Sequence, residues 1–153
     1  MKNENLNVDV NIFIEHKDAS ETILGKYAYH NVTTNTGKVG LAARMGTATN
    51  PVTYVGIGTG TTGELATDTT LEAEITTGGG ARSSATVSLV TTSLTNDTLQ
   101  LLKTFTFSSP FTVSETAAFD ASSAGIMSNR KTFTGIPVVA TDQLTIIHQF
   151  KIS

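Results

Sequence analysis

The sequence contains no cysteine and no tryptophan among its 153 residues, and only three prolines. The lack of cysteine excludes a disulfide framework, a thiol nucleophile and every metal or iron–sulfur site that depends on thiolates. Charged side chains are also scarce, at 15% of the residues against about 25% in an average soluble protein. The polar surface must therefore consist mainly of uncharged groups.

The charge balance and the hydropathy argue against two classes of partner. Ten basic and 13 acidic residues give a formal charge of −3, and no cluster of lysine and arginine provides the basic surface that binds nucleic acid. No apolar run approaches the roughly 18 to 20 residues that cross a bilayer, and residues 1–5 lack the apolar core of a cleaved signal peptide. We therefore expect no nucleic-acid partner, no membrane span and no cleaved export signal.

Threonine and glycine dominate what is present. Threonine occurs 28 times and glycine 13 times. Threonine is β-branched and suits the pleated surface of a sheet, whereas glycine suits tight turns. This composition predicts an all-β protein.

A period-two pattern at the N-terminus predicts a β-hairpin. Apolar residues alternate with other residues over residues 7–16, and a second strand is expected over residues 23–32. We regard residues 1–34 as an attachment segment and residues 35–153 as the body of a single domain. The side chains that we expect at an interface are Val8, Val10, Ile12, Phe13, Ile14, Tyr27 and Tyr29.

The rest of the chain predicts seven to nine short strands in total, separated by turns. Residues 38–45 have the spacing of a short amphipathic helix that ends at Gly46. Residues 58–70 are so rich in glycine, threonine and aspartate that we expect a long surface loop or a switch between sheets. A brief helical turn over residues 70–75 is a further expectation. The predicted fold is an antiparallel β-sandwich of the jelly-roll or immunoglobulin-like type.

Residues 58–63 match the pattern GxGxxG after a predicted strand, which is half of a dinucleotide-binding fingerprint. The residues that follow are poor helix formers, and the expected acidic ligand about 20 residues further on would fall in the glycine run 78–80. We interpret the motif as a glycine-rich loop and expect no bound cofactor.

The other residues that could carry chemistry are dispersed. His16, His30 and His148 lack metal-ligand spacing, although three such residues could still converge in space. Asp68, Glu72 and Glu74 could bind a cation from a loop, but the spacing of a calcium loop is absent, so we favour solvated carboxylates (residues 68–74). We assign no catalytic, cofactor or metal residues and expect no enzymatic activity.

One ion pair is predicted from the order of the strands. Glu115 lies among apolar residues of one strand and Arg130 lies in the next, with a turn of small residues at 120–125 between them. If both side chains face inward they need each other, because an unpaired buried charge costs several kcal/mol. The alternative is that both are exposed.

The order of three segments resembles a group of small virion proteins of tailed bacteriophages, variously described as tail-fibre-like, head-fibre or capsid decoration proteins. The segments are YVGIGTGTTGELATDTTLEAEI at 54–75, VSETAAFDASSAGIMSNRKTF at 113–133 and ATDQLTIIHQFKI at 140–152. The resemblance spans roughly Asn31 to Ile152. It implies a β-sandwich within an assembled particle and no catalytic role.

From this resemblance we expect a non-enzymatic structural protein that decorates the outside of a phage capsid or forms part of a head fibre. Its expected partners are a second or third copy of itself, as a dimer or trimer, and other virion proteins such as the major capsid protein. The expected location is the exterior of a particle assembled in the host cytoplasm. The alternative is a tail-fibre or baseplate adaptor that contacts a host-surface glycan, and a polysaccharide hydrolase is a more remote third hypothesis, because the paired carboxylates of such enzymes are lacking.

Overall fold

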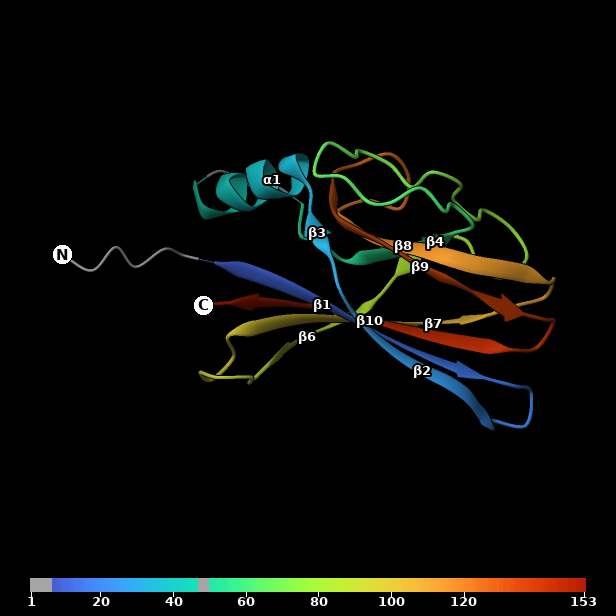
Figure 1. The fold of residues 1–153 in the computed structure, drawn as a ribbon. Helices are drawn as coiled ribbons and strands as arrows, with labels where there is room; N and C mark the ends of the chain where they lie inside the picture. Colours follow the sequence, from blue (N-terminus) through green and yellow to red (C-terminus); the bar gives the residue numbers. More distant parts are fainter. Residues whose placement is uncertain (1–6, 47–49) are drawn as a thin grey trace.

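The computed structural model describes residues 7–46 and 50–153 and consists of two five-stranded antiparallel sheets and one helix in that part of the chain (Figure 1). The predicted all-β sandwich is therefore confirmed. In chain order the elements are β1 (Val8–Lys17), β2 (Ile23–His30), β3 (Val32–Thr33), α1 (Asn35–Gly46), β4 (Tyr54–Gly58), β5 (Ser83–Ser84), β6 (Thr86–Val90), β7 (Thr98–Thr106), β8 (Phe111–Phe119), β9 (Met127–Val138) and β10 (Gln143–Ile152).

The first sheet has the strand order β2-β1-β10-β7-β6, and the second has the order β3-β9-β8-β4-β5. Strand β1 lies inside the first sheet. It pairs with β10 along its whole length, from Val8 opposite Ile152 to Lys17 opposite Gln143, and with β2 on its other side. The expected division of the chain after residue 34 is thus not a structural boundary, because the N-terminal hairpin forms part of the same sheet as the C-terminal strand. Residues 1–6 of the expected attachment segment lie outside the described residues.

The core lies between the two sheets and includes three of the expected interface residues. Val10, Ile12 and Ile14 are buried against the second sheet. The prediction that these three residues form an interface is therefore wrong, because they are core residues. The alternation of β1 correctly predicts a strand with one apolar face. That face packs inside the sandwich, because the partner strand β10 comes from the other end of the chain.

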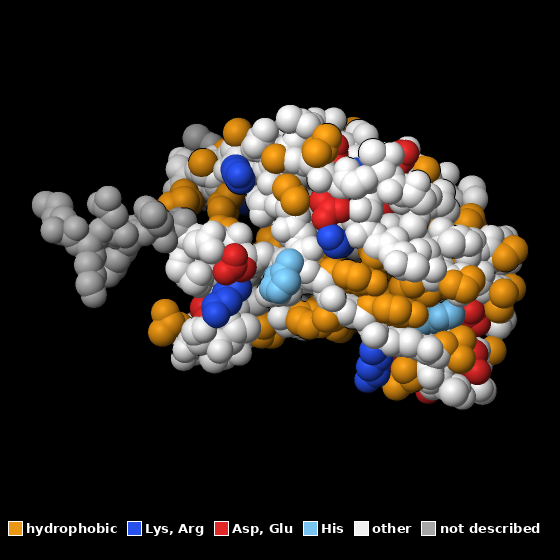
Figure 2. All heavy atoms as spheres, viewed as in Figure 1, with side chains coloured by type: hydrophobic (Ala, Val, Ile, Leu, Met, Phe, Trp, Pro, Cys, Tyr) orange, Lys and Arg blue, Asp and Glu red, His pale blue; other side chains and the backbone are white. Residues whose placement is uncertain are grey.

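Aromatic side chains line one open edge between the sheets. The rings of Tyr27 and Tyr29 on β2 are stacked with centroids 6.5 Å apart, and Tyr29 stacks on Phe133 of β9 at 5.4 Å. Hydrophobic side chains are visible between the two layers in Figure 2. Both tyrosines are half-buried and pack against the core, so they link β2 to the second sheet.

Helix α1 begins three residues earlier than the pattern predicted. The hydroxyl of Thr34 accepts a hydrogen bond from the N–H of Gly37 at 3.0 Å, so Thr34 is the N-cap residue. Gly37 lies directly against β9, and a Cβ at this position would come within 2.2 Å of the carbonyl oxygen of Ser128. The glycine therefore allows the helix to approach the sheet closely, and the helix ends at Gly46 as expected.

The long connection between β4 and β5 covers the outer face of the second sheet (Figure 1). Its Leu71 is buried in a small apolar cluster with Ala117, Phe119 and Met127. Residues 70–75 form no helical turn, contrary to expectation, because Glu74 instead makes a β-bridge with Gly58. The connection is a surface loop, as predicted, but one that is packed on the sheet.

Candidate functional site

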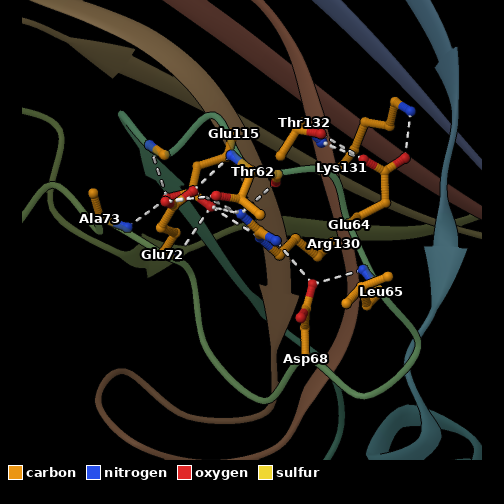
Figure 3. A network of polar contacts seen from close by, with 11 residues as sticks. Thr62, Glu64, Leu65, Asp68, Glu72, Ala73, Glu115, Arg130, Lys131 and Thr132 are labelled. Atoms are coloured by element: carbon orange, nitrogen blue, oxygen red, sulfur yellow. Dashed lines mark hydrogen bonds and ion pairs between the residues drawn. The ribbon is translucent and has the colours of Figure 1, made fainter.

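Glu115 and Arg130 are in contact on the outer face of the second sheet. Nε of Arg130 donates a hydrogen bond to Oε2 of Glu115 at 2.9 Å, and Nη2 lies 2.8 Å from the same oxygen (Figure 3). The side chain of Glu115 is 0% exposed and that of Arg130 is 4% exposed. The predicted ion pair is therefore formed, and both partners are buried.

The loop between β4 and β5 supplies two more carboxylates to this arginine. Nη1 of Arg130 donates to Oδ2 of Asp68 at 2.8 Å, and Nη2 lies 3.6 Å from Oε2 of Glu72. Nη2 also donates to the carbonyl oxygen of Thr62 at 3.2 Å. We call Arg130, Glu115, Asp68 and Glu72 the Arg130 cluster. Asp68 is thus not the solvated carboxylate that we favoured, because it is bound to a buried guanidinium, whereas Glu72 faces the same group but is 42% exposed.

The buried carboxylate of Glu115 also binds the backbone of the loop. It accepts hydrogen bonds from the N–H groups of Gly60 at 3.2 Å, Glu72 at 3.1 Å and Ala73 at 2.8 Å (Figure 3). A buried charge is tolerated when it is paired and its remaining lone pairs are satisfied. Glu115 therefore has a structural role, because it binds two separate points of the loop and holds them against β8.

Hydrogen bonds and neighbouring charges shift the pKa values of Arg130, Asp68 and Glu72 toward their ionised forms. Burial alone would lower the pKa of Arg130, but its hydrogen bonds with Asp68 and Glu115 raise it above the usual value. Burial alone would raise the pKa of Asp68, but hydrogen bonds from the N–H of Leu65 and from Arg130 lower it. Arg130 and Asp68 are therefore charged at neutral pH, and their attraction holds the loop against the sheet.

The GxGxxG pattern is explained by the same cluster. A Cβ at Gly58 would lie 2.4 Å from Oε1 of Glu115, and a Cβ at Gly60 would lie 2.6 Å from it. A Cβ at Gly63, by contrast, would have nothing within 4 Å. The first two glycines thus let the backbone pass next to the buried carboxylate, and no helix follows them as a dinucleotide site would require.

Two further ion pairs fasten the ends of the loop. Glu64 binds the ammonium of Lys131 and accepts hydrogen bonds from the N–H and hydroxyl of Thr132 on β9. Burial alone would raise the pKa of Glu64, but the bonds with Lys131 and Thr132 outweigh it and lower the pKa to about 2. Glu74 binds Arg82 through two hydrogen bonds of 2.7 Å.

The guanidinium of Arg82 is held on three sides. Its carbon Cζ lies 3.4 Å from the centre of the Phe119 ring, and Nη1 donates to the carbonyl oxygens of Ala124 at 2.8 Å and Ala121 at 3.3 Å. It therefore ties the loop to the β8–β9 turn. The predicted long surface loop is therefore held in place on the second sheet by these contacts.

His148 lies in the core, away from the Arg130 cluster. Its Nε2 is 3.1 Å from the hydroxyl of Thr116, and its Nδ1 is 2.9 Å from Nδ2 of Asn129. Since the Asn129 amide group is a donor, the imidazole is neutral with its proton on Nε2, and burial lowers its pKa to about 3. This side chain bridges β10 to β8 and β9 inside the sandwich.

The three histidines do not converge. His16 contacts Asp142 at 2.9 Å between buried side chains, His30 is exposed on β2, and His148 is in the core. Among residues 7–46 and 50–153, no group of three or more histidine, cysteine, aspartate or glutamate side chains is arranged so that it could hold a metal ion. The described helix is not long and apolar enough to cross a bilayer.

The outer face of the first sheet presents rows of uncharged side chains across its middle, with charged side chains toward its ends, such as Asp9 opposite Lys151 and Glu15 opposite Lys26. Pairing places Phe13 between Ala28 and Ile147, and Ile147 next to Leu102. The adjoining row contains Gln149, which donates to the side chain of Gln100 at 2.7 Å. We call this surface the open face. None of the described segments covers it, since α1 and the long loop lie on the side of the second sheet (Figure 1).

The remaining interface candidates have different positions. Phe13 lies on the open face and is 39% exposed, where it lines a depression of about 340 Å³ with Ala28 and Ile147. Val8 is half-buried at the start of β1. Tyr27 and Tyr29 join the two sheets, as described above. Of the seven candidates, Phe13 is the one that projects from the outer side of a sheet.

Comparison with known proteins identifies no relative: no family model, no curated protein and no solved structure matches this chain. The functional argument therefore rests on the residues and on the geometry.

Proposed function

We propose that this protein is a non-enzymatic structural component of a tailed-bacteriophage particle, which decorates the capsid exterior or forms part of a head fibre. The open face is the observation that carries the proposal. It combines an apolar row with rows that contain glutamine, threonine and asparagine. The charged side chains lie toward its two ends: Glu15 binds Lys26 at 3.0 Å and Lys17 at 3.2 Å, and Asp9 is opposite Lys151. Such a surface can be dehydrated against another protein at little electrostatic cost.

The fixed loop on the opposite side supports the same proposal. A decoration protein must keep its shape while one side is bound to the particle, and the buried ion pair at Glu115, with partly buried pairs at Glu64 and Glu74, holds the loop on the second sheet. The two sides of the sandwich thus have different tasks. The open face binds a virion protein such as the major capsid protein, and the loop side faces outward.

Binding to phage particles tests the proposal. The substitution Phe13→Lys places a charge in the middle of the apolar row, so the purified variant should sediment with decoration-depleted capsids much less than the unchanged protein. Val139→Lys is the matched control, because Val139 is also an exposed apolar residue but lies in the β9–β10 turn. Equal capsid binding by the Phe13 variant, or no binding by the unchanged protein, would refute the assignment of this face.

A second function, a tail-fibre or baseplate adaptor that contacts a host glycan, is favoured by one observation. The loop side has a polar depression of about 340 Å³ beside Arg130, lined by hydroxyl and carboxylate groups. Its lining residues are Thr62, Thr67, Asp68, Thr69, Thr70, Glu72 and Arg130. Binding to host cells that is lost in Thr69→Val, with capsid binding absent, would favour the adaptor over the decoration protein.

A further inference from the structure

The end of the sandwich at which β1 begins and β10 ends has an apolar groove between α1 and the first sheet. The groove has a volume of about 290 Å³, and we call it the end groove. Its apolar lining includes Val8, Leu41, Val87, Leu89, Leu99 and Phe150. The helix, the ends of β1 and β10, and the β6–β7 loop all lie at this end (Figure 1).

The groove is apolar because the edge strand β5 of the second sheet is shorter than the edge strand β6 of the first. Leu89 pairs with Leu99, and Val87 pairs with the buried Leu101, so Val87 and Leu89 are on the core-facing side of the first sheet. The edge strand of the second sheet on that side, β5, has two residues and does not cover them. Leu89 is therefore 60% exposed although it faces inward. Sequence alternation alone would assign it to the core.

A rigid apolar projection stands next to the groove. Leu94, at the tip of the β6–β7 loop, is 73% exposed. The carboxylate of Asp97 fixes this loop by accepting hydrogen bonds from the N–H groups of Thr92 at 2.9 Å, Ser93 at 2.8 Å and Leu94 at 2.8 Å. A preorganised loop loses little conformational entropy when it binds, so the exposed leucine is suited to insertion into an apolar site.

The position of the projection relative to the groove suggests its partner. Asn96 and Asp97 belong to the loop and also line the groove. When a projection and its complementary hollow are neighbours on one surface, a two-fold rotation brings each into contact with the other on a second copy, and the assembly closes. Such a dimer has two equivalent contacts, and each of them buries the projection of one copy in the groove of the other.

The charges are complementary in the same arrangement. The loop carries the carboxylate of Asp97, and Lys38 of α1 lines a second depression that adjoins the groove and shares Val8 and Leu41 with it. Lys38 makes no ion pair among the described residues. When the loop of one copy enters the groove of the other, it approaches α1 and brings Asp97 toward Lys38. Opposite charges therefore meet at both ends of the two-fold contact.

We propose that the end groove is the self-association site of this protein, in which Leu94 of each copy enters the groove of the other to form a two-fold dimer. This inference is independent of the particle assignment, because it concerns the contact between copies and uses a surface separate from the open face. A dimer formed in this way would present two open faces, and each could bind one site on a particle.

The test uses two variants of the full chain, each measured alone and in mixture by sedimentation equilibrium. Leu94→Asp removes the projection, and Leu89→Lys places a charge in the groove. Each alone should weaken the dimer by about 100-fold or more, because each homodimer loses both apolar insertions. In the mixed dimer, Leu94 of the Leu89→Lys chain enters the unchanged groove of the Leu94→Asp chain. At the other contact the introduced carboxylate meets the introduced ammonium, so the mixed dimer should form.

Controls separate this site from folding and from other surfaces. Both substitutions are at exposed positions, so circular dichroism should be unchanged, and Val139→Asp, at an exposed apolar residue in the β9–β10 turn, should leave the dimer intact. Lys38→Glu should weaken the dimer several-fold at low ionic strength. A monomeric unchanged protein, a dimer that survives both variants, or a mixture that stays monomeric would each overturn the proposal, as would open-ended assembly.

Discussion

Oε1 of Glu115 lies 2.4 Å from the place that a Cβ at Gly58 would occupy, so the loop and the carboxylate that binds it fit together because residue 58 has no side chain. The contact joins a glycine of β4 to the buried charge on β8, and Arg130 on β9 completes it. The stability of the loop side can therefore be tested at the glycine, at the acid and at the surrounding carboxylates.

Gly58→Ala should destabilise the protein. The added methyl group would meet both Glu115 and the carbonyl oxygen of Ala73, which is 2.6 Å away, and forced overpacking of this kind costs about 1–3 kcal/mol. Gly63→Ala is the matched control in the same motif, because a Cβ there has no neighbour within 4 Å. Urea unfolding of both variants measures the difference, and equal stabilities would contradict the close approach.

Glu115→Ala should have a larger effect than either glycine variant. It leaves the guanidinium of Arg130 buried beside an empty space, and the loss of one partner from a buried ion pair costs about 3–5 kcal/mol. Glu21→Ala is the control, because Glu21 is exposed and makes no ion pair among the described residues. An unchanged melting temperature of the Glu115 variant would refute the structural role of the pair.

The ion pair could be predicted from the sequence, but the complete cluster could not. Glu115 and Arg130 are 15 residues apart and joined by one turn, so strand order alone brought them together. Asp68 is 62 residues from Arg130, and its approach depends on how the loop folds over the sheet. Threonine and glycine content predicted a loop there, yet composition has no information about which buried charge the loop will meet.

The strands were predictable for a similar reason, and their partners were not. Alternation identified β1 within one residue of its observed bounds, because period two is a local property. That Val10, Ile12 and Ile14 form core and not interface depends on pairing between strands 126 residues apart, as the contact of His16 with Asp142 illustrates. Local patterns contain no signal for such pairing.

Acid should destabilise the protein through Glu64. The pKa of Glu64 is about 2 in the folded state against 4.5 for the unperturbed group, so unfolding takes up a proton in this interval and the free energy of unfolding falls as the pH falls from 4.5 to 2. Glu64→Gln should show a shallower fall over this range. Parallel pH profiles for the variant and the unchanged protein would contradict the assignment.

His148 should act in a higher pH range. Its pKa is about 3 when folded against 6.5 when unperturbed, so the unfolded state binds a proton first as the pH falls below 6.5. The free energy of unfolding should therefore decrease between pH 6.5 and pH 4.5, above the range of Glu64. The decrease should be smaller in His148→Gln and retained in His30→Gln, whose histidine is exposed. If the His30 variant, and not the His148 variant, lost this decrease in the free energy of unfolding, the titrating group would be on β2 and the prediction would be contradicted.

The most direct test of the central claim, that this protein is a structural part of a phage particle, is its copy number in purified particles, measured by quantitative mass spectrometry against the major capsid protein. The account predicts that the chain copurifies with the particles at a fixed ratio to that protein, as a decoration protein does. Absence from the particles, together with abundance in the soluble fraction of infected cells, would contradict it.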